Sequence, residues 1–308
     1  LRPLDDHALL WTSERDGHAH LYRLSNGTLE QLTAGEGRIS RILWADPTQA
    51  LVLGWFDDPT EQHVYSVTIG SGPPGRPTRL TAAPGWHEVV ASPDGTRLLD
   101  RHTALDSPGS LGVIERLRDR DPVRHTIAAE RIEPGHPYHP FLARHATPRL
   151  GTLDAEDGQR LYFRLTRPSG SQPPSNGYPV IVNVYGGPGV QRVRNEWSPL
   201  LLQLLAGHGY AVLELDNRGS GYRCPRFEAP IHGLLGDVEV RDQLRGVEFL
   251  RSLDWVDPTR IGVMGHSYGG YMALLCLLKA PAVFRAAVAT APVTDWTLYD
   301  THYTERYM

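Results

Sequence analysis

The chain has 308 residues, which suggests two domains because a single hydrophobic core rarely grows beyond about 250–300 residues. A hydrophobic content of 40%, a charged content of 21% and a net charge of −4 indicate a soluble globular protein and give no reason to expect nucleic acid or an anionic membrane as a partner. Cys224 and Cys276 are too few for a disulfide framework, and the stretch "PLLLQLLAG" is too short to span a bilayer.

Residues 1–125 are predicted to form short strands separated by turns. In "HLYRLSNGTLEQLT", alternating apolar positions flank Asn26-Gly27, a strong signal for a hairpin. A similar unit returns 43 residues later, from His20 to His63, and a weaker third copy begins at Ala91. A strand repeat with a period in the forties is typical of β-propeller blades. About three blades are too few to close a ring, so we expect the others upstream of Leu1.

Residues 126–160 are interpreted as a connecting segment and the start of a hydrolase domain, and residues 161–308 as the N-terminal portion of an α/β-hydrolase domain. Near-continuous apolar strands are predicted at 178–186, 210–219, 260–265 and 284–292, with helices at 198–209, 236–253 and 268–280. Asp237 is expected to cap the second helix. This alternation predicts a doubly wound, mostly parallel sheet that is incomplete at the C-terminus.

One serine stands between a predicted strand and a predicted helix. Gly265-His266-Ser267-Tyr268-Gly269 matches G-x-S-x-G, the turn that presents a nucleophilic hydroxyl above a parallel sheet. The alternative is a structural turn serine. Tyr185, in "VYGGPG" at the end of an earlier strand, is a candidate oxyanion donor together with the amide of Tyr268, although a tyrosine at a strand end is also a common packing residue.

The histidine and aspartate that a serine nucleophile needs are not evident in the chain. Asp295 and His302 follow Ser267 in the right order, but they come so soon after it that they would have to double back into the site. We therefore expect the triad aspartate and histidine after residue 308 and expect the 308-residue chain alone to be inactive. His136 and His139 have metal-ligand spacing but lie among prolines, so we expect a linker there and no metal or cofactor.

Blades followed by an α/β-hydrolase domain resemble the prolyl oligopeptidase family of serine peptidases. "VYGGPG", "DNRGSGY" and "APVTDWTLYDTHYTERYM" resemble its dipeptidyl peptidase IV branch, and bacterial members in particular. The resemblance implies that Ser267 is the nucleophile and that the Tyr185 hydroxyl and the Tyr268 amide form the oxyanion hole. It departs at His266, where many members have tryptophan. The S1 pocket that the resemblance implies is lined by Tyr268, Val293, Trp296, Tyr299 and Tyr303.

The function implied is a serine-type peptidase that releases N-terminal dipeptides with proline or alanine at the second position through an acyl-enzyme. The glutamates that hold the substrate's amino terminus in this family are expected before residue 1. A broader oligopeptidase, an acylaminoacyl-type peptidase or esterase, and a non-catalytic propeller–hydrolase scaffold remain open. The resemblance also implies a homodimer of the full-length protein, and it leaves a cytoplasmic or periplasmic location open.

Overall fold

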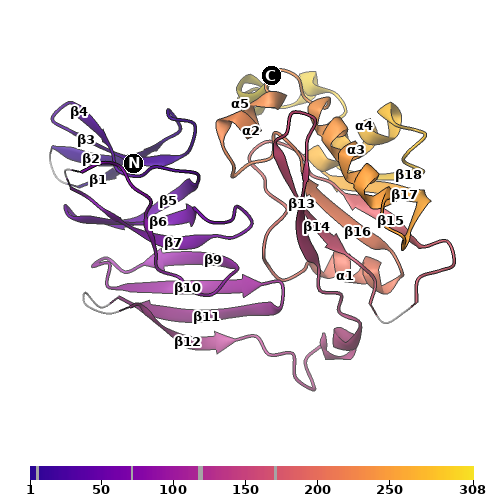
Figure 1. Cartoon of the computed structure of the whole chain (residues 1–308), viewed down its shortest axis with the longest axis horizontal. Coiled ribbons are helices and arrows are strands. Elements are labelled where there is room, and N and C mark those ends of the chain that lie inside the picture. Colours follow the sequence, from indigo (N-terminus) through magenta and orange to yellow (C-terminus); the bar gives the residue numbers. More distant parts are fainter. Residues whose placement is uncertain (5–6, 71, 117–120, 170–171) are drawn as a thin grey trace. The chain divides into compact units, whose positions relative to one another are not determined.

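A computed structural model describes the chain except residues 5–6, 71, 117–120 and 170–171. The described chain forms two compact units (Figure 1), each of which contains more than one segment of the sequence. Unit 1 comprises Leu1–Arg131, Arg194–Trp197 and Tyr222–Pro225. Unit 2 comprises Ile132–Val193, Ser198–Gly221 and Arg226–Met308.

Unit 1 contains three four-stranded antiparallel sheets, each with its strands in sequence order. This arrangement confirms the predicted partial propeller. At the first hairpin, Asn26 and Gly27 both have positive φ, as the turn signal predicts. The strands are β1 (Arg2–Pro3), β2 (Ala8–Ser13), β3 (His20–Ser25), β4 (Thr28–Gln31), β5 (Arg38–Ala45), β6 (Gln49–Trp55), β7 (His63–Thr68), β8 (Thr78–Arg79), β9 (Trp86–Ala91), β10 (Arg97–Ala104), β11 (Ser107–Glu115) and β12 (Val123–Ala129).

A buried histidine at the start of a strand explains the repeat seen in the sequence. His20 Nδ1 lies 3.1 Å from Thr33 Oγ1, and His63 Nδ1 lies 2.9 Å from Thr81 Oγ1. Each threonine oxygen also accepts the backbone N–H of the residue after the histidine, at 3.0 Å for Leu21. The repeated His and Thr therefore connect segments of one blade. They also give hydrogen-bond partners to buried backbone N–H groups that the pairing between strands does not satisfy.

The sheets of unit 1 pack through two apolar clusters. Side chains of the first two sheets form one cluster, in which Leu10, Leu21 and Val52 are fully buried. Side chains of the second and third sheets form the other, which includes Leu53 and Leu98. Burial of this apolar surface is the main force that holds successive blades together.

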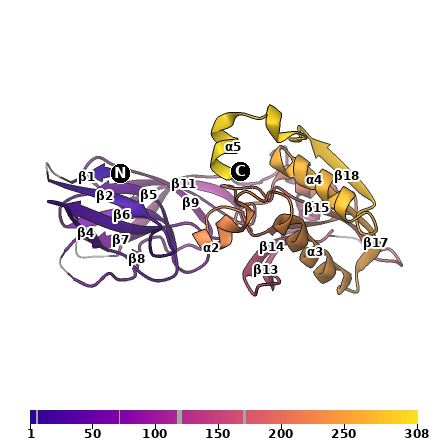
Figure 2. The ribbon, with the colours of Figure 1, turned by 90° about the horizontal axis from the view of Figure 1, so that it is seen from above.

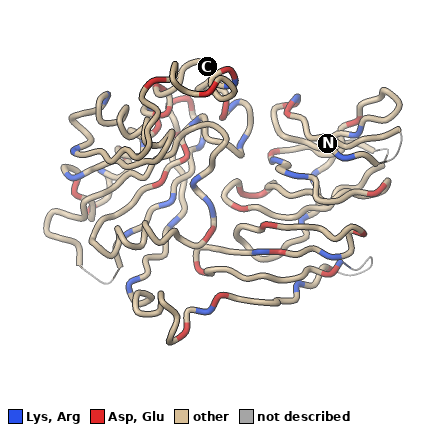
Figure 3. The backbone as a smooth tube through the Cα atoms, turned by 180° about the vertical axis from the view of Figure 1, so that it is seen from behind, with Lys and Arg blue, Asp and Glu red and all other residues tan. Residues whose placement is uncertain are grey.

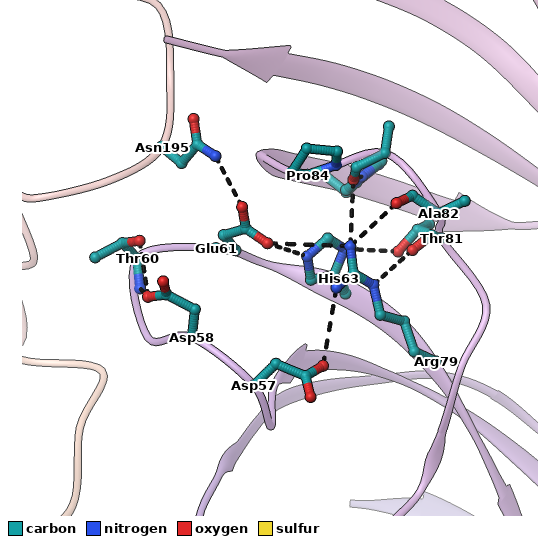
Figure 4. A network of polar contacts seen from close by, with 12 residues as sticks. Asp57, Asp58, Thr60, Glu61, His63, Arg79, Thr81, Ala82, Pro84 and Asn195 are labelled. Atoms are coloured by element: carbon teal, nitrogen blue, oxygen red, sulfur yellow. Dashed lines mark hydrogen bonds and ion pairs between the residues drawn. The ribbon is translucent and has the colours of Figure 1, made fainter. Parts of the chain in front are cut away.

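Asn195 ties the segment Arg194–Trp197 to two blades of unit 1. Its side chain donates to Glu61 Oε1 at 2.8 Å, and the other carboxylate oxygen of Glu61 lies 2.8 Å from His63 Nε2. Figure 4 shows how these side chains face one another. The Asn195 backbone N–H donates to Thr60 O, and its side-chain oxygen accepts the N–H of Leu105. One asparagine thus bonds to the loop before β7 and to the β10–β11 turn.

Unit 2 is built on a six-stranded sheet in the order β13-β14-β16-β15-β17-β18, in which the last four strands are parallel. The parallel part is as predicted, whereas the antiparallel hairpin β13–β14 was not predicted as two strands. The elements are η1 (His139–Arg144), β13 (Arg149–Asp154), β14 (Arg160–Thr166), β15 (Tyr178–Asn183), α1 (Leu200–Gly207), β16 (Ala211–Asp216), α2 (Pro225–Glu228), η2 (Ala229–Ile231), α3 (Val238–Arg251), β17 (Val256–His266), α4 (Tyr268–Lys279), β18 (Ala286–Thr290), η3 (Trp296–Leu298) and α5 (Thr301–Tyr307).

Helices cover both faces of this sheet. On one face α3 and α4 lie side by side (Figures 1 and 2), and Gly246 of α3 lies against Leu213 and Leu215 of β16. Alternate residues of β16 face the opposite side, where α1 contacts the same strand. Covering both faces explains why the parallel strands read as near-continuous apolar runs.

Charged residues of both signs are interspersed along the chain (Figure 3). No helix in the described part of the chain is long and apolar enough to cross a membrane. These observations agree with the weak net charge and the short apolar stretches of the sequence.

We expect Asp100→Ala to destabilise unit 1 by about 3 kcal/mol, because it removes a fully buried carboxylate and leaves the Arg124 guanidinium, which is 24% exposed, without this partner. The Asp100 carboxylate is inaccessible to solvent and accepts from His87 Nδ1 at 2.9 Å and Arg124 Nε at 2.6 Å. Glu88→Ala is the matched control, since its pair with Arg101 is exposed, and it should lower stability by less than about 1 kcal/mol. Urea denaturation measures both, and similar losses in the two variants would contradict the prediction.

Candidate active site

Ser267 occupies a strained turn between β17 and α4. Its backbone has φ 59° and ψ −121°, a combination that L-residues rarely adopt. The Ser267 N–H donates to Thr290 O at 2.9 Å, and its carbonyl accepts the N–H of Gly270 and of Tyr271. The residue is half-buried, so the turn does not place it in the packed interior.

The glycines of the G-x-S-x-G motif are required by close packing around this turn. A Cβ added at Gly265 would lie 2.1 Å from Gly269 O, and one added at Gly269 would lie 2.2 Å from Val184 O. Both distances are far shorter than a carbon–oxygen contact can be. The backbone approach that lifts Ser267 therefore tolerates no side chain at either position.

Tyr185 and Tyr268 lie next to each other beside this turn. Their ring centroids are 6.0 Å apart, and Gly187 packs so closely that a Cβ there would be 2.5 Å from Tyr268 Cγ. Tyr268 is the first residue of α4, where the backbone N–H has no acceptor within its own helix. Burial raises the pKa of Tyr185, and the nearby phenols of Tyr299 and Tyr307 raise it further. The positive charge of Arg192 lowers it, but the net shift is upward. Tyr185 is therefore a neutral phenol that can donate a hydrogen bond.

The Tyr268 side chain is held by a hydrogen bond to Glu239 of α3. Its hydroxyl donates to Glu239 Oε1 at 2.6 Å, and both oxygens of that buried carboxylate accept the Gly236 N–H at 2.9 Å. Burial raises the pKa of both Glu239 and Tyr268.

The prediction that the Asp237 side chain caps α3 is wrong. Asp237 stands at the N-cap position, but its side chain makes no hydrogen bond to the first turn, and its Oδ2 lies 3.4 Å from Arg241 Nη2.

Aromatic side chains from η3 and α5 extend from Tyr268. Trp296 lies 5.9 Å from the Tyr268 ring and stacks on Tyr303 at 5.8 Å, with the ring planes only 4° apart. Tyr299 meets Trp296 and Tyr303 edge-on and is 40% exposed. Val293 is half-buried in the segment that precedes η3. The five residues expected to line an S1 pocket thus come from five places in unit 2: α4, the segment before η3, η3 itself, the residue after η3, and α5.

The other candidate side chains have local roles or are exposed. Asp295 Oδ1 accepts both the N–H and the hydroxyl of Thr297, at 2.9 and 2.6 Å, whereas His266 and His302 are exposed. His136 Nδ1 accepts the N–H of Tyr138 at 3.1 Å. In the part of the chain that the structure describes, no three His, Cys, Asp or Glu residues are grouped as a metal site requires.

We expect Gly269→Ala to destabilise unit 2 by about 3 kcal/mol, because its Cβ would collide with the Val184 carbonyl. Gly207→Ala in α1 is the control, since a Cβ there meets nothing within 4 Å; its stability should stay within about 1 kcal/mol of the parent. Thermal or urea denaturation compares the two, and an equally stable Gly269→Ala variant would show that the turn tolerates a side chain.

The mixed sheet with its Ser267 turn, together with the blades of unit 1, defines a protein of the propeller and α/β-hydrolase class. Residues 196–308 match the sequence model of the Prolyl oligopeptidase family, and residues 2–109 match that of the Dipeptidyl peptidase IV (DPP IV) N-terminal region. The chain belongs to the prolyl oligopeptidase family and is of the dipeptidyl peptidase IV type. This confirms the family resemblance proposed from "VYGGPG", "DNRGSGY" and "YTERYM".

Similar proteins include both curated sequences and solved structures. Dipeptidyl peptidase 8 of Mus musculus is 34% identical over 290 residues, a match that covers 90% of this chain and 32% of the relative. A Bacteroides ovatus structure assigned as a dipeptidyl aminopeptidase IV has a TM-score of 0.86 at 30% identity and covers 99% of this chain and 45% of that one. Porphyromonas gingivalis dipeptidyl peptidase 4 has a TM-score of 0.87 at 27% identity, with coverage of 98% and 42%. The chain thus spans less than half the length of these relatives.

Proposed function

We propose that the protein containing this chain is a serine-type dipeptidyl peptidase that releases N-terminal X-Pro or X-Ala dipeptides through an acyl-enzyme. The observation that carries the proposal is the half-buried Ser267 at the β17–α4 turn, beside the neutral phenol of Tyr185 and the first amide of α4. Relatives that bear the name dipeptidyl peptidase support the same substrate class.

In the proposed reaction, Ser267 Oγ attacks the carbonyl carbon of the second substrate residue. As the new C–O bond forms, the carbonyl π electrons move to oxygen, and the Tyr268 N–H and the Tyr185 hydroxyl donate to this oxyanion. Collapse breaks the C–N bond, and the leaving amine takes the proton that Ser267 gave up. Water then hydrolyses the ester. The proposal includes a histidine base and its aspartate from a segment outside the 308 residues.

Substrate selection in this proposal rests on the aromatic side chains beside Tyr268. Trp296 and Tyr303 are stacked with nearly parallel planes, so they offer a flat and rigid apolar surface. Such a surface, with Tyr268, Val293 and Tyr299, suits the short apolar side chain of proline or alanine better than a long one.

The proposal has two further parts. Glutamates outside this chain recognise the substrate's amino terminus, and the full-length protein forms a homodimer.

In the full-length protein, we expect Tyr185→Phe to lower kcat for an X-Pro arylamide by about 100- to 1,000-fold with little change in KM, because it removes one oxyanion donor. Tyr210→Phe is the matched control and should keep full activity, since Tyr210 precedes β16 at the opposite end of that strand from the site. Ser267→Ala should abolish turnover. Activity that survives Ser267→Ala would contradict the proposed function and favour a scaffold role for this domain.

We also expect N-acetylation of the same X-Pro arylamide to lower kcat/KM by at least 100-fold, because an acetylated nitrogen carries no positive charge for a carboxylate to hold. Steady-state kinetics with the free and acetylated substrates measure this ratio. Equal rates would instead indicate a broader oligopeptidase or an acylaminoacyl-type peptidase.

A further inference from the structure

The motif "DNRGSGY", residues 216–222, has no role in the reaction proposed above, yet it lies against the loop that carries Tyr185. That loop, residues 184–193, follows β15 and contains no helix or strand, and Gly186 and Gly189 have positive φ. Backbone groups outside regular structure need other partners when they are buried. The question is what holds Tyr185 at one position on such a loop.

Asn217 holds the loop at the residue directly after Tyr185. The fully buried Asn217 side chain donates from Nδ2 to Gly186 O at 2.9 Å and to Arg218 O at 2.7 Å. Its Oδ1 accepts from Gln243 Nε2 of α3 at 2.8 Å. A Cβ at Gly186 would lie only 2.7 Å from Asn217 Oδ1, so the loop rests directly on this amide.

Asp216 holds the other end of the loop. Its buried carboxylate accepts the Arg192 N–H at Oδ1, at 2.9 Å, and the Val193 N–H at Oδ2, at 3.0 Å. Between the two ends, the Gly221 N–H donates to Val190 O at 3.0 Å. Because each carboxylate oxygen accepts a different backbone N–H, Asp216 holds two successive residues of the loop at once.

The motif is itself fixed to α3. The Arg218 guanidinium donates from Nη2 to Asp242 Oδ1 at 2.6 Å, and its backbone N–H donates to Asp242 Oδ2 at 2.8 Å. Both side chains are buried, and burial of a paired charge in good geometry leaves little freedom to move. The chain of contacts therefore runs from a rigid helix, through residues 216–218, to both ends of the Tyr185 loop.

We propose that Asn217 and Asp216 are positioning residues that fix the Tyr185 hydroxyl where it can donate to the oxyanion. This inference rests on the proposed function of Tyr185. Oxyanion stabilisation depends on preorganised donors, and a remote mutation that misplaces a catalytic group by about 1 Å can lower a rate about 100-fold. Loss of the Asn217 bond should therefore weaken catalysis through Tyr185 rather than substrate binding.

The test is a double-mutant cycle in the full-length protein with an X-Pro arylamide as substrate. We expect Asn217→Ala to lower kcat by about 10- to 100-fold with KM changed less than about threefold. In a Tyr185→Phe background, Asn217→Ala should change kcat less than about threefold, because the donor that it positions is already absent. Asn176→Ala, at an exposed loop position, is the matched control and should leave kcat unchanged.

The outcomes separate the two proposals. If Tyr185→Phe has no effect, the proposed oxyanion role fails and the positioning inference fails with it. If Tyr185→Phe slows the reaction but Asn217→Ala does not, or lowers kcat by the same factor in both backgrounds, the positioning inference alone is overturned. Asp216→Asn keeps the side-chain volume and serves as the second variant if Asn217→Ala does not fold. The same dependence on Tyr185 is expected for it.

Discussion

The backbone of Ser267 is held in a conformation that an isolated serine would leave, and the geometry of the candidate active site depends on that constraint. The strain is stabilised by contacts that only glycine permits: Gly265 lies against Gly269 O, and Gly269 lies against Val184 O. Val184 also directly precedes Tyr185. The same close approach of two loops therefore raises the serine and brings the Tyr185 loop beside it, so the candidate nucleophile and the candidate oxyanion donor share one set of contacts.

Helix α3 supplies the second layer of this arrangement through polar residues that have no access to solvent. Glu239, Asp242 and Gln243 lie on one face at i, i+3 and i+4, and each is fully buried. They bond to Tyr268, Arg218 and Asn217 respectively. Buried polar groups are stabilising only when each finds a partner. Here one partner, Tyr268, is a candidate site residue, and the other two belong to the motif that bonds to the Tyr185 loop. The helix thus contributes the geometry of the site as well as its core packing.

The fold class and the family followed from local sequence patterns, whereas the contacts that hold the site together did not. Continuous apolar runs predicted β15, β16, β17 and β18, and the glycine spacing around Ser267 predicted the turn. The hairpin β13–β14 was not predicted as two strands, although Asp157-Gly158 between alternating residues is a hairpin signal. Glu239 was missed for a different reason: an acidic residue in the first turn of a helix is ordinarily solvent-exposed, and only tertiary packing shows that it binds Tyr268.

The chain crosses between its two units more than once, because Arg194–Trp197 and Tyr222–Pro225 belong to unit 1 although their flanking residues belong to unit 2. Asn195 bonds to Glu61 there, and the Tyr222 carbonyl accepts from the Trp55 indole at 2.8 Å. A chimera joined at a single residue near 131 would consequently pair one parent's blades with the other parent's two short segments. Recombination between relatives should preserve folding best when these eight residues are exchanged together with the blades.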